Sequence, residues 1–292
     1  MKIGMNLPVM VPGLDRPTIL EWARRIDAGP YASLAAGERI TFPNPEIMVT
    51  VAAAAAVTER VRLALTVIVL PMHSAVLIAK QVATLDVISN GRVSLGLGVG
   101  ARVEDYRALG ASFDGNRMKR MEEQIAVMRR VWKGENVVAG AHRPVEPFPL
   151  QPGGPELLAG ALAAPSIRRC ARWADGICGF SFGPSMDEVA FAYDTARQAW
   201  QELGRTPPRL VMSFWFALGP NARPQMDEYL QRYLCFLGDD VARALAPTVK
   251  VTSASALRDA ARMLEDLGTD ELILVPTTSD PDEVKRVADI LG

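Results

Sequence analysis

The sequence is poor in the residues from which metal sites and disulfide frameworks are built. It has two histidines, His73 and His142, so a centre made of several histidines is excluded. Its three cysteines, Cys170, Cys178 and Cys235, form no C-x-x-C pair. An odd number of such cysteines is typical of a reducing compartment. We therefore expect free, buried thiols and no metal site.

The sequence also lacks an excess of one charge and any long apolar run. Lysine and arginine number 32, and aspartate and glutamate number 33, so the basic surface that nucleic acid requires is absent. No stretch reaches the roughly 18 apolar residues of a membrane span. The N-terminal segment is interrupted by Gly4, Pro8 and Pro12, unlike a signal peptide. The sequence predicts a cytoplasmic protein that binds neither nucleic acid nor a membrane.

The clearest pattern lies in the first half of the chain. An apolar run over 62–70 precedes an amphipathic run over 74–88, and Asn90-Gly91 then turns into a second apolar run over 93–99. Two buried parallel strands joined by a helix form a βαβ unit.

Similar units continue along the chain without a domain-breaking linker. Asn44-Pro45-Glu46 predicts a helix start with Asn44 as its cap, and Ser185 with Glu188 forms a capping-box pattern. About eight strands alternating with helices predict one (β/α)₈ barrel domain over 1–292, with a helical insertion near 219–250. Besides 62–70 and 93–99, we expect strands over 2–7, 31–36, 156–160, 177–180, 210–218 and 271–275.

A doubly wound sheet is the alternative fold. Gly96, Gly98 and Gly100 suggest a dinucleotide-binding loop, but Val103 occupies the position of its third glycine. The loop also follows the fourth expected strand and not the first. The barrel accounts better for these glycines, since a backbone can then approach a ligand at the C-terminal rim.

Several segments resemble one known family. LPMHSAVLIAKQVATLDVISNGRVSLGLGVG followed by DYRALG, and then RMKRMEEQIAVMRRVW, RRCARWADGI and LGTDELILV, occur in the order expected for that family. The chain is similar to the luciferase-like flavin- and deazaflavin-dependent oxidoreductases over nearly its whole length.

The resemblance implies a barrel, usually dimeric, with reduced FMN or coenzyme F-420 at the C-terminal rim. The cofactor ring would rest on a bulge in the third strand, with a non-proline cis peptide at Val67-Ile68. The loop at Gly98 and Gly100 would approach the cofactor. Its phosphate would lie against backbone N–H groups of the loop Gly160, Ala161, Leu162 and Ala163 and the helix start near Ser166.

Three positions depart from the family pattern. Arg39 stands where the family has a rim histidine. Val103 stands where some deazaflavin enzymes have a catalytic glutamate. The segment 160–163 replaces a Gly-Gly-Ser phosphate loop, and its leucine offers an N–H group but no hydroxyl.

The candidate catalytic residues are Arg39, Glu38 and His73. Arg39 could steady an anionic substrate or the charge of the reduced cofactor, with Glu38 orienting it, or the two could form a rim salt bridge. His73 could transfer a proton or serve as a hydrogen-bonded rim residue. Arg102 could bind a phosphate, and Asn6 could line the substrate pocket.

Three functions follow from these features. The first is a luciferase-like oxidoreductase acting on a small organic substrate, as a monooxygenase with reduced FMN or by hydride transfer with F-420. The second is a protein of the same fold that binds a ligand or partner without turnover, suggested by Arg39 and the altered phosphate loop. The third is a pyridine-nucleotide dehydrogenase on a doubly wound sheet. The resemblance and an alanine-rich segment at 52–56 also predict a homodimer.

Overall fold

The computed structural model describes residues 1–183 and 185–292. Its strands pair in parallel in sequence order, and β1 pairs with both β2 and β8, so the sheet closes into a barrel and the expected fold is confirmed. The doubly wound alternative is wrong because that sheet is open. The strands are β1 (Lys2–Asn6), β2 (Ser33–Ala36), β3 (Arg62–Val69), β4 (Val93–Gly98), β5 (Glu156–Ala159), β6 (Gly176–Phe180), β7 (Arg209–Phe216) and β8 (Glu271–Pro276).

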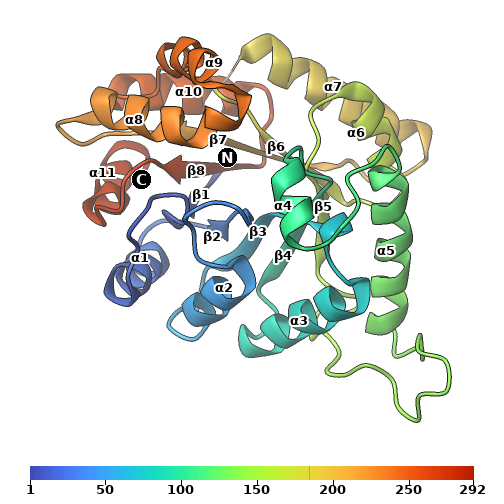
Figure 1. Ribbon diagram of the computed structural model, residues 1–292. Helices are drawn as coiled ribbons and strands as arrows, with labels where there is room; N and C mark the ends of the chain where they lie inside the picture. Colours follow the sequence, from blue (N-terminus) through green and yellow to red (C-terminus); the bar gives the residue numbers. More distant parts are fainter. Residues whose placement is uncertain (184) are drawn as a thin grey trace.

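Helices surround the strands (Figure 1). No helix among the described residues is long and apolar enough to cross a membrane. The α-helices are α1 (Arg16–Ala28), α2 (Ile47–Ala55), α3 (Ala75–Ile88), α4 (Val103–Ala108), α5 (Arg117–Trp132), α6 (Ala164–Cys170), α7 (Met186–Glu202), α8 (Ala222–Leu234), α9 (Asp239–Leu245), α10 (Ala254–Asp266) and α11 (Asp282–Leu291). Short 3₁₀ turns are η1 (Leu70–Met72), η2 (Cys235–Leu237) and η3 (Ala246–Thr248).

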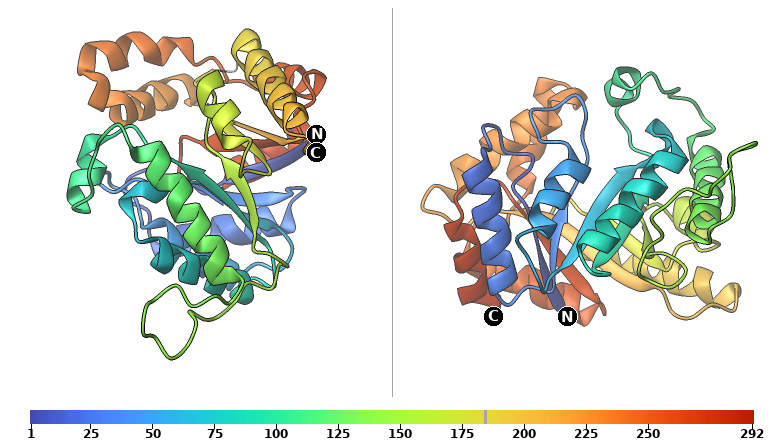
Figure 2. Two further views of the ribbon diagram at one scale, coloured as in Figure 1. Left: turned by 90° about the vertical axis from the view of Figure 1, so that its right-hand side faces the viewer. Right: turned by 90° about the horizontal axis from the view of Figure 1, so that it is seen from below.

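The insertion predicted near 219–250 is helical, as expected, and consists of α8, η2, α9 and η3. In the left view of Figure 2, the orange insertion and the green helix α4 lie toward one end of the barrel, and both termini lie at the other. Both α4 and α8 follow carboxyl ends of strands. The insertion therefore stands over the mouth where barrel enzymes place their active sites.

Two predicted helix caps are wrong in detail. Glu46 caps α2, because its Oε2 accepts the N–H of Val49 at 2.7 Å. Asn44 donates instead to the carbonyls of Arg39 and Pro45, which fixes the loop after β2. Helix α7 begins after Ser185 as expected, but the Ser185 side chain caps no N–H group.

The cysteines follow the expectation in part. Cys170 and Cys178 are buried, and burial raises the pKa of each thiol to about 12. Cys235 is exposed on η2, so the expectation that all three thiols are buried is wrong. The buried face of α8 carries Met226, Leu230 and Leu234, and the chain beyond it, from Cys235 to Leu237, is exposed.

Side chains fill the barrel in two layers, starting from the amino ends of the strands. At the amino ends of the strands, Arg209 forms ion pairs with Glu156 and Glu271, and Glu271 also accepts the Ser33 hydroxyl at 2.5 Å. An apolar layer lies above these groups and consists of Ala35, Ala64, Leu158, Cys178, Val211 and Ile273. These two layers fill the interior with side chains, as is typical of such barrels.

The third strand breaks the regular pattern above this layer. Its pairing with β4 shifts register between Leu65 and Ile68, and the cis peptide is Thr66–Val67, one residue before the expected bond. Ile68 is fully buried in the surrounding core, whereas Val67 is half-buried, and the place of Ile68 beneath a cofactor stays a prediction. The shift turns the side chain of Val67 into the barrel, where it packs on the apolar layer.

Three glycines make room for that side chain. A Cβ atom on Gly98 would lie 2.9 Å from Val67 Cγ2, and Cβ atoms on Gly160 and Gly96 would lie 2.9 and 3.1 Å from Val67 Cγ1. Gly100 has a positive φ of 59°, and its Cβ would lie 2.7 Å from Val69. The glycines thus leave space for the valine side chains of β3. We call Val67 together with Gly96, Gly98 and Gly160 the Val67 shelf.

Replacing Gly98 by alanine should destabilise the fold through Val67. The added methyl group forces Val67 to move, at a cost of about 1–3 kcal/mol. The cost should fall when the change is made in a Val67→Ala background, because the two residues are in contact. Urea unfolding of the single and double variants measures this coupling. Gly115→Ala, whose Cβ meets nothing within 4 Å, is the matched control. If Gly98→Ala lowered the free energy of unfolding equally in both backgrounds, Val67 would not be the residue that the added methyl group displaces.

Replacing Arg209 by methionine should destabilise the barrel by about 3 kcal/mol, because Glu156 and Glu271 lose their common partner and Glu271 is 3% exposed. The urea midpoint at neutral pH is the measurement. Arg258→Met, on an exposed position of α10, should change the free energy of unfolding by less than about 0.5 kcal/mol. A loss for Arg209→Met no larger than for this control would show that the ion pairs add nothing to stability.

Candidate active site

The mouth of the barrel is covered on one side and accessible on the other. Asn6, the last residue of β1, is 5% exposed, and Glu38 and Arg39, which follow β2, are 8% and 9% exposed. Across the mouth, Gly160 after β5 is exposed and Phe180 at the end of β6 is half-buried. The mouth therefore remains accessible beside β5 and β6.

Aromatic side chains of β7 and the insertion form the cover. Trp215 of β7 is 1% exposed and lies 6.1 and 5.1 Å, between ring centroids, from Tyr229 and Tyr233 of α8. Phe180 and Phe182 pack on the other edges of Trp215, at 4.5 and 5.2 Å. The cluster joins the insertion to the barrel and gives the accessible side an aromatic wall.

The loop predicted to bind phosphate has fewer free N–H groups than expected. Gly160 N–H donates to the carbonyl of Leu97 and Ala161 N–H to that of Ala159. The backbone N–H groups of Leu162 and Ala163 donate to no acceptor within the described residues. The Leu162 side chain fills the space over Gly179, where a Cβ would come within 2.6 Å of it. This packing accounts for a leucine in the loop.

Two of the predicted catalytic residues, Glu38 and His73, are in contact. Glu38 Oε1 lies 2.9 Å from His73 Nε2, and its Oε2 accepts the N–H of Val69 at 2.7 Å. The Glu38 side chain is 3% exposed and that of His73 is 19% exposed. When Nε2 donates to Glu38, Nδ1 is left as an acceptor. Glu38 therefore orients His73 and not Arg39, which corrects the predicted pairing.

Asp105 orients Arg39 instead. Its Oδ2 accepts Arg39 Nε at 2.9 Å, and its Oδ1 accepts both the N–H and the hydroxyl of Thr41. Burial opposes ionisation of Asp105, but the hydrogen bonds from Thr41 and Arg39 outweigh it and lower the pKa of the carboxyl group. The sequence analysis did not predict this contact, because it joins the loop after β2 to helix α4, 66 residues further along the chain.

The insertion contacts both rim arginines. Arg39 lies 4.9 Å from the ring centroid of Phe42 and 5.8 Å from that of Tyr233, and Arg102 lies 4.9 Å from Tyr233 and 4.1 Å from Phe236. We call these five residues the arginine–aromatic stack. Sequence reasoning missed Tyr229 and Tyr233, although their spacing of four residues puts both on one face of a helix.

The remaining predicted residues are placed as follows. Asn6 is buried at the end of β1 and its side-chain amide donates to the carbonyl of Leu7. His142 is exposed, far along the loop between α5 and β5. Val103 begins α4, and the neighbouring Glu104 is exposed.

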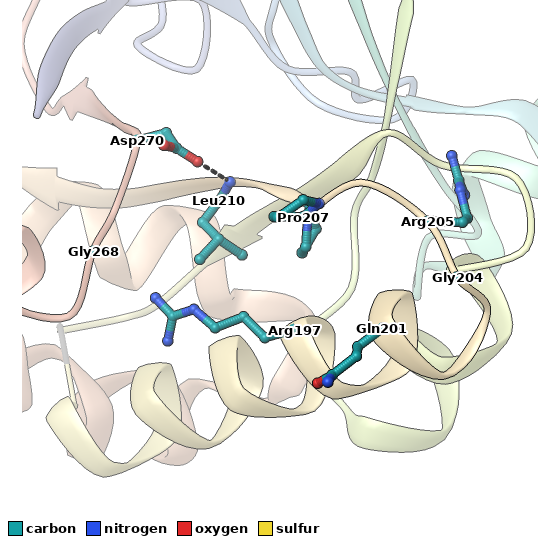
Figure 3. Close-up of a pocket in the computed structure, with 9 residues that line it drawn as sticks. Arg197, Gln201, Gly204, Arg205, Pro207, Leu210, Gly268 and Asp270 are labelled. Carbon is teal, nitrogen blue, oxygen red and sulfur yellow. Dashed lines mark hydrogen bonds between the residues drawn. The ribbon is translucent and has the colours of Figure 1, made fainter.

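A separate pocket of about 740 Å³ opens at the opposite end of the barrel, near the starts of β7 and β8 (Figure 3). Its charged groups are already paired: Asp270 accepts the N–H of Leu210, and Arg197 binds Asp194 and the carbonyl of Leu267. Figure 3 shows Asp270 directed at the strand and not into the pocket. This arrangement supports the fold and presents no free catalytic group.

Curated relatives match part of the chain. An uncharacterised protein of Mycobacterium bovis is 32% identical over 186 residues, which are 61% of this chain and 58% of the relative. The 4-hydroxyprotoasukamycin monooxygenase of Streptomyces nodosus subsp. asukaensis is 29% identical over 68% of this chain and 57% of its own length. The match thus spans less than two thirds of these relatives.

Solved structures match over the whole chain. A monooxygenase from Streptomyces bottropensis has a TM-score of 0.81 and 23% identity, covering 100% of this chain and 98% of its own. An F-420-dependent secondary alcohol dehydrogenase, in complex with an F-420–acetone adduct, scores 0.78 at 14% identity with the same coverage. The FMN-bound oxygenating component of 3,6-diketocamphane monooxygenase from Pseudomonas putida scores 0.74 at 18%, covering 100% of this chain and 95% of its own. At these identities the likeness establishes the fold alone.

The family model for luciferase-like monooxygenases matches residues 1–286. This range includes every strand of the barrel, the Val67 shelf and the insertion. The chain belongs to the luciferase-like monooxygenase family.

Proposed function

We propose that this protein is a flavin- or deazaflavin-dependent oxidoreductase that acts on a small organic substrate at the accessible side of the barrel mouth. The observation that carries the proposal is the Val67 shelf beside an aromatic wall, in a chain whose family consists of luciferase-like monooxygenases. One structural neighbour binds FMN and another F-420, which supports this class of cofactor without choosing between the two.

The residues at the mouth fit a flat ring with an anionic tail. Val67 offers an apolar surface, and Phe180 and Phe182 offer aromatic ones. Free N–H groups of Leu162 and Ala163 suit a phosphate. Bound at this mouth, reduced FMN would supply electrons to O₂, and reduced F-420 would supply a hydride.

The chain's own contribution is to orient and to handle protons. Glu38 holds the His73 ring, so that Nδ1 can accept or return a proton. Arg39, held by Asp105, presents a fixed positive charge at the rim. The aromatic cover over β7 keeps water from the buried side of the mouth, which strengthens both effects.

A family member without catalytic activity is the weaker reading. It rests on Arg39, which replaces the family's rim histidine, and on the altered phosphate loop. The Glu38–His73 pair supplies a histidine at the adjoining strand end. Leu162 has a packing role that leaves its N–H group free. These observations favour an active enzyme.

We further propose that residues 1–292 act as one domain in the cytoplasm, supported by one closed barrel and by free thiols, and that the chain forms a homodimer. The face shared by α2 and α3 exposes Val49, Leu77 and Ile88 by 72%, 53% and 52%. A groove of about 300 Å³ runs between these helices. Such a continuous apolar face suits a second copy of the chain.

Titration of the purified protein with reduced FMN and with reduced F-420 tests the cofactor. One of them should bind at micromolar concentration. Ala163→Glu should weaken that binding by about tenfold or more, since a carboxylate would repel the phosphate. Ala139→Glu, at an exposed position in a distant loop, should leave it unchanged. Absence of micromolar binding for both cofactors rules the proposal out.

Sedimentation velocity tests the dimer. Leu77→Glu, and separately Val49→Glu, should convert a dimer to a monomer because each buries an unpaired charge in the contact. Phe191→Glu is the matched control, since Phe191 is 63% exposed on α7, outside this face. A wild-type monomer at working concentration, or dissociation by the control, counts against this face.

A further inference from the structure

Two arginines, the buried Arg39 and the half-buried Arg102, meet at the covered side of the mouth. Arg39 comes from the loop after β2 and Arg102 from the loop after β4, and both guanidinium groups stack on the ring of Tyr233. Phe42 and Phe236 close the outer faces of the arginine–aromatic stack. Aromatic faces hold a guanidinium in place but leave its N–H groups, which lie in the guanidinium plane, without acceptors.

Each arginine has a donor without a partner. Arg39 Nη1 and Arg102 Nε are buried, and no acceptor for either lies within the described residues. The Arg39 side chain is 7% exposed. A buried polar group without a partner costs about 1–3 kcal/mol, and more when it is charged. Two such donors at one site therefore indicate a missing acceptor.

The local charge is also unbalanced. Asp105 pairs with Arg39, but Arg102 forms no ion pair within the part of the chain that the structure describes. Burial lowers the pKa of Arg102, and the positive charge of Arg39 adds to that effect. Arginine nevertheless stays charged in proteins. The site carries two positive charges and one negative, so it favours an anion over a neutral ligand.

We propose that Arg39 and Arg102 bind an anionic group of the substrate, a carboxylate in the first instance. The proposal rests on the proposed function, since it assumes that the substrate occupies this mouth. A carboxylate oxygen accepts several hydrogen bonds and matches the planar guanidinium. Tyr233 and Phe236 bring the insertion into the same site, so the segment 219–250 acts in substrate selection.

The cofactor phosphate is the other anion to consider. The loop suited to it follows β5. Arg102 follows the neighbouring strand β4, but Arg39, the other half of the proposed site, follows β2, three strands around the barrel from that loop. Arg39 also lies on the covered side, and the 160–163 loop on the accessible side. The substrate is thus the better source of the anion.

Isothermal titration of the cofactor-free protein with benzoate and acetate, and with benzamide and acetamide, tests the site. Benzoate and benzamide have nearly the same shape, as do acetate and acetamide, but only the carboxylate of each pair is charged. At least one carboxylate should bind about tenfold or more tightly than its amide. Arg39→Gln and Arg102→Gln should each lower carboxylate affinity by about tenfold. Arg107→Gln, on an exposed position of α4, should not.

Two further measurements make a negative result interpretable. Thermal midpoints show whether the variants fold, and Arg102→Gln leaves the Arg39–Asp105 pair intact. FMN and riboflavin titrations separate the two anions: loss of FMN affinity alone in the arginine variants would assign the pair to the cofactor phosphate and overturn the proposal. No carboxylate binding, or equal binding of carboxylate and amide, would overturn it even where the cofactor binds.

Discussion

The packing of one valine against three glycines determines the shape of the barrel mouth. The register shift in β3 turns Val67 inward, and Gly96, Gly98 and Gly160 leave the volume that its methyl groups occupy. Interiors are packed so densely that even one added methyl group is felt. This contact fixes the position of the Val67 shelf. It therefore also sets the height in the barrel up to which side chains fill the interior.

The insertion then divides the mouth into two unequal sides. Its tyrosines pack on Trp215, and Tyr233 also lies against the buried Arg39. The side beside β5 and β6 stays accessible, with backbone N–H groups and aromatic rings along it. One side is therefore suited to a flat cofactor with a charged tail, and the other to a small substrate held by fixed charges.

Two carboxylates hold the polar side chains of the rim in place. Glu38 fixes His73, and Asp105 fixes Arg39, so neighbouring residues in the sequence have different partners in space. A proton-handling group and a fixed cation thus lie on adjacent loops. Membership of the luciferase-like monooxygenase family supplies the context in which such groups are useful. In the function that we propose, a bound cofactor would provide the redox chemistry, and these side chains would orient the reactants and handle protons.

The sequence by itself determined the barrel, the insertion and the family, because strand and helix periodicity and long motifs are local properties. It also placed Glu38, Arg39 and His73 at the rim, since residues at carboxyl ends of barrel strands lie there, and their catalytic roles stay predictions. It could not pair them, place the cis bond or recognise Asp105, Tyr233 and Phe236 as part of the rim. Those features depend on side chains that meet across loops distant in sequence, and only the closed barrel brings them together.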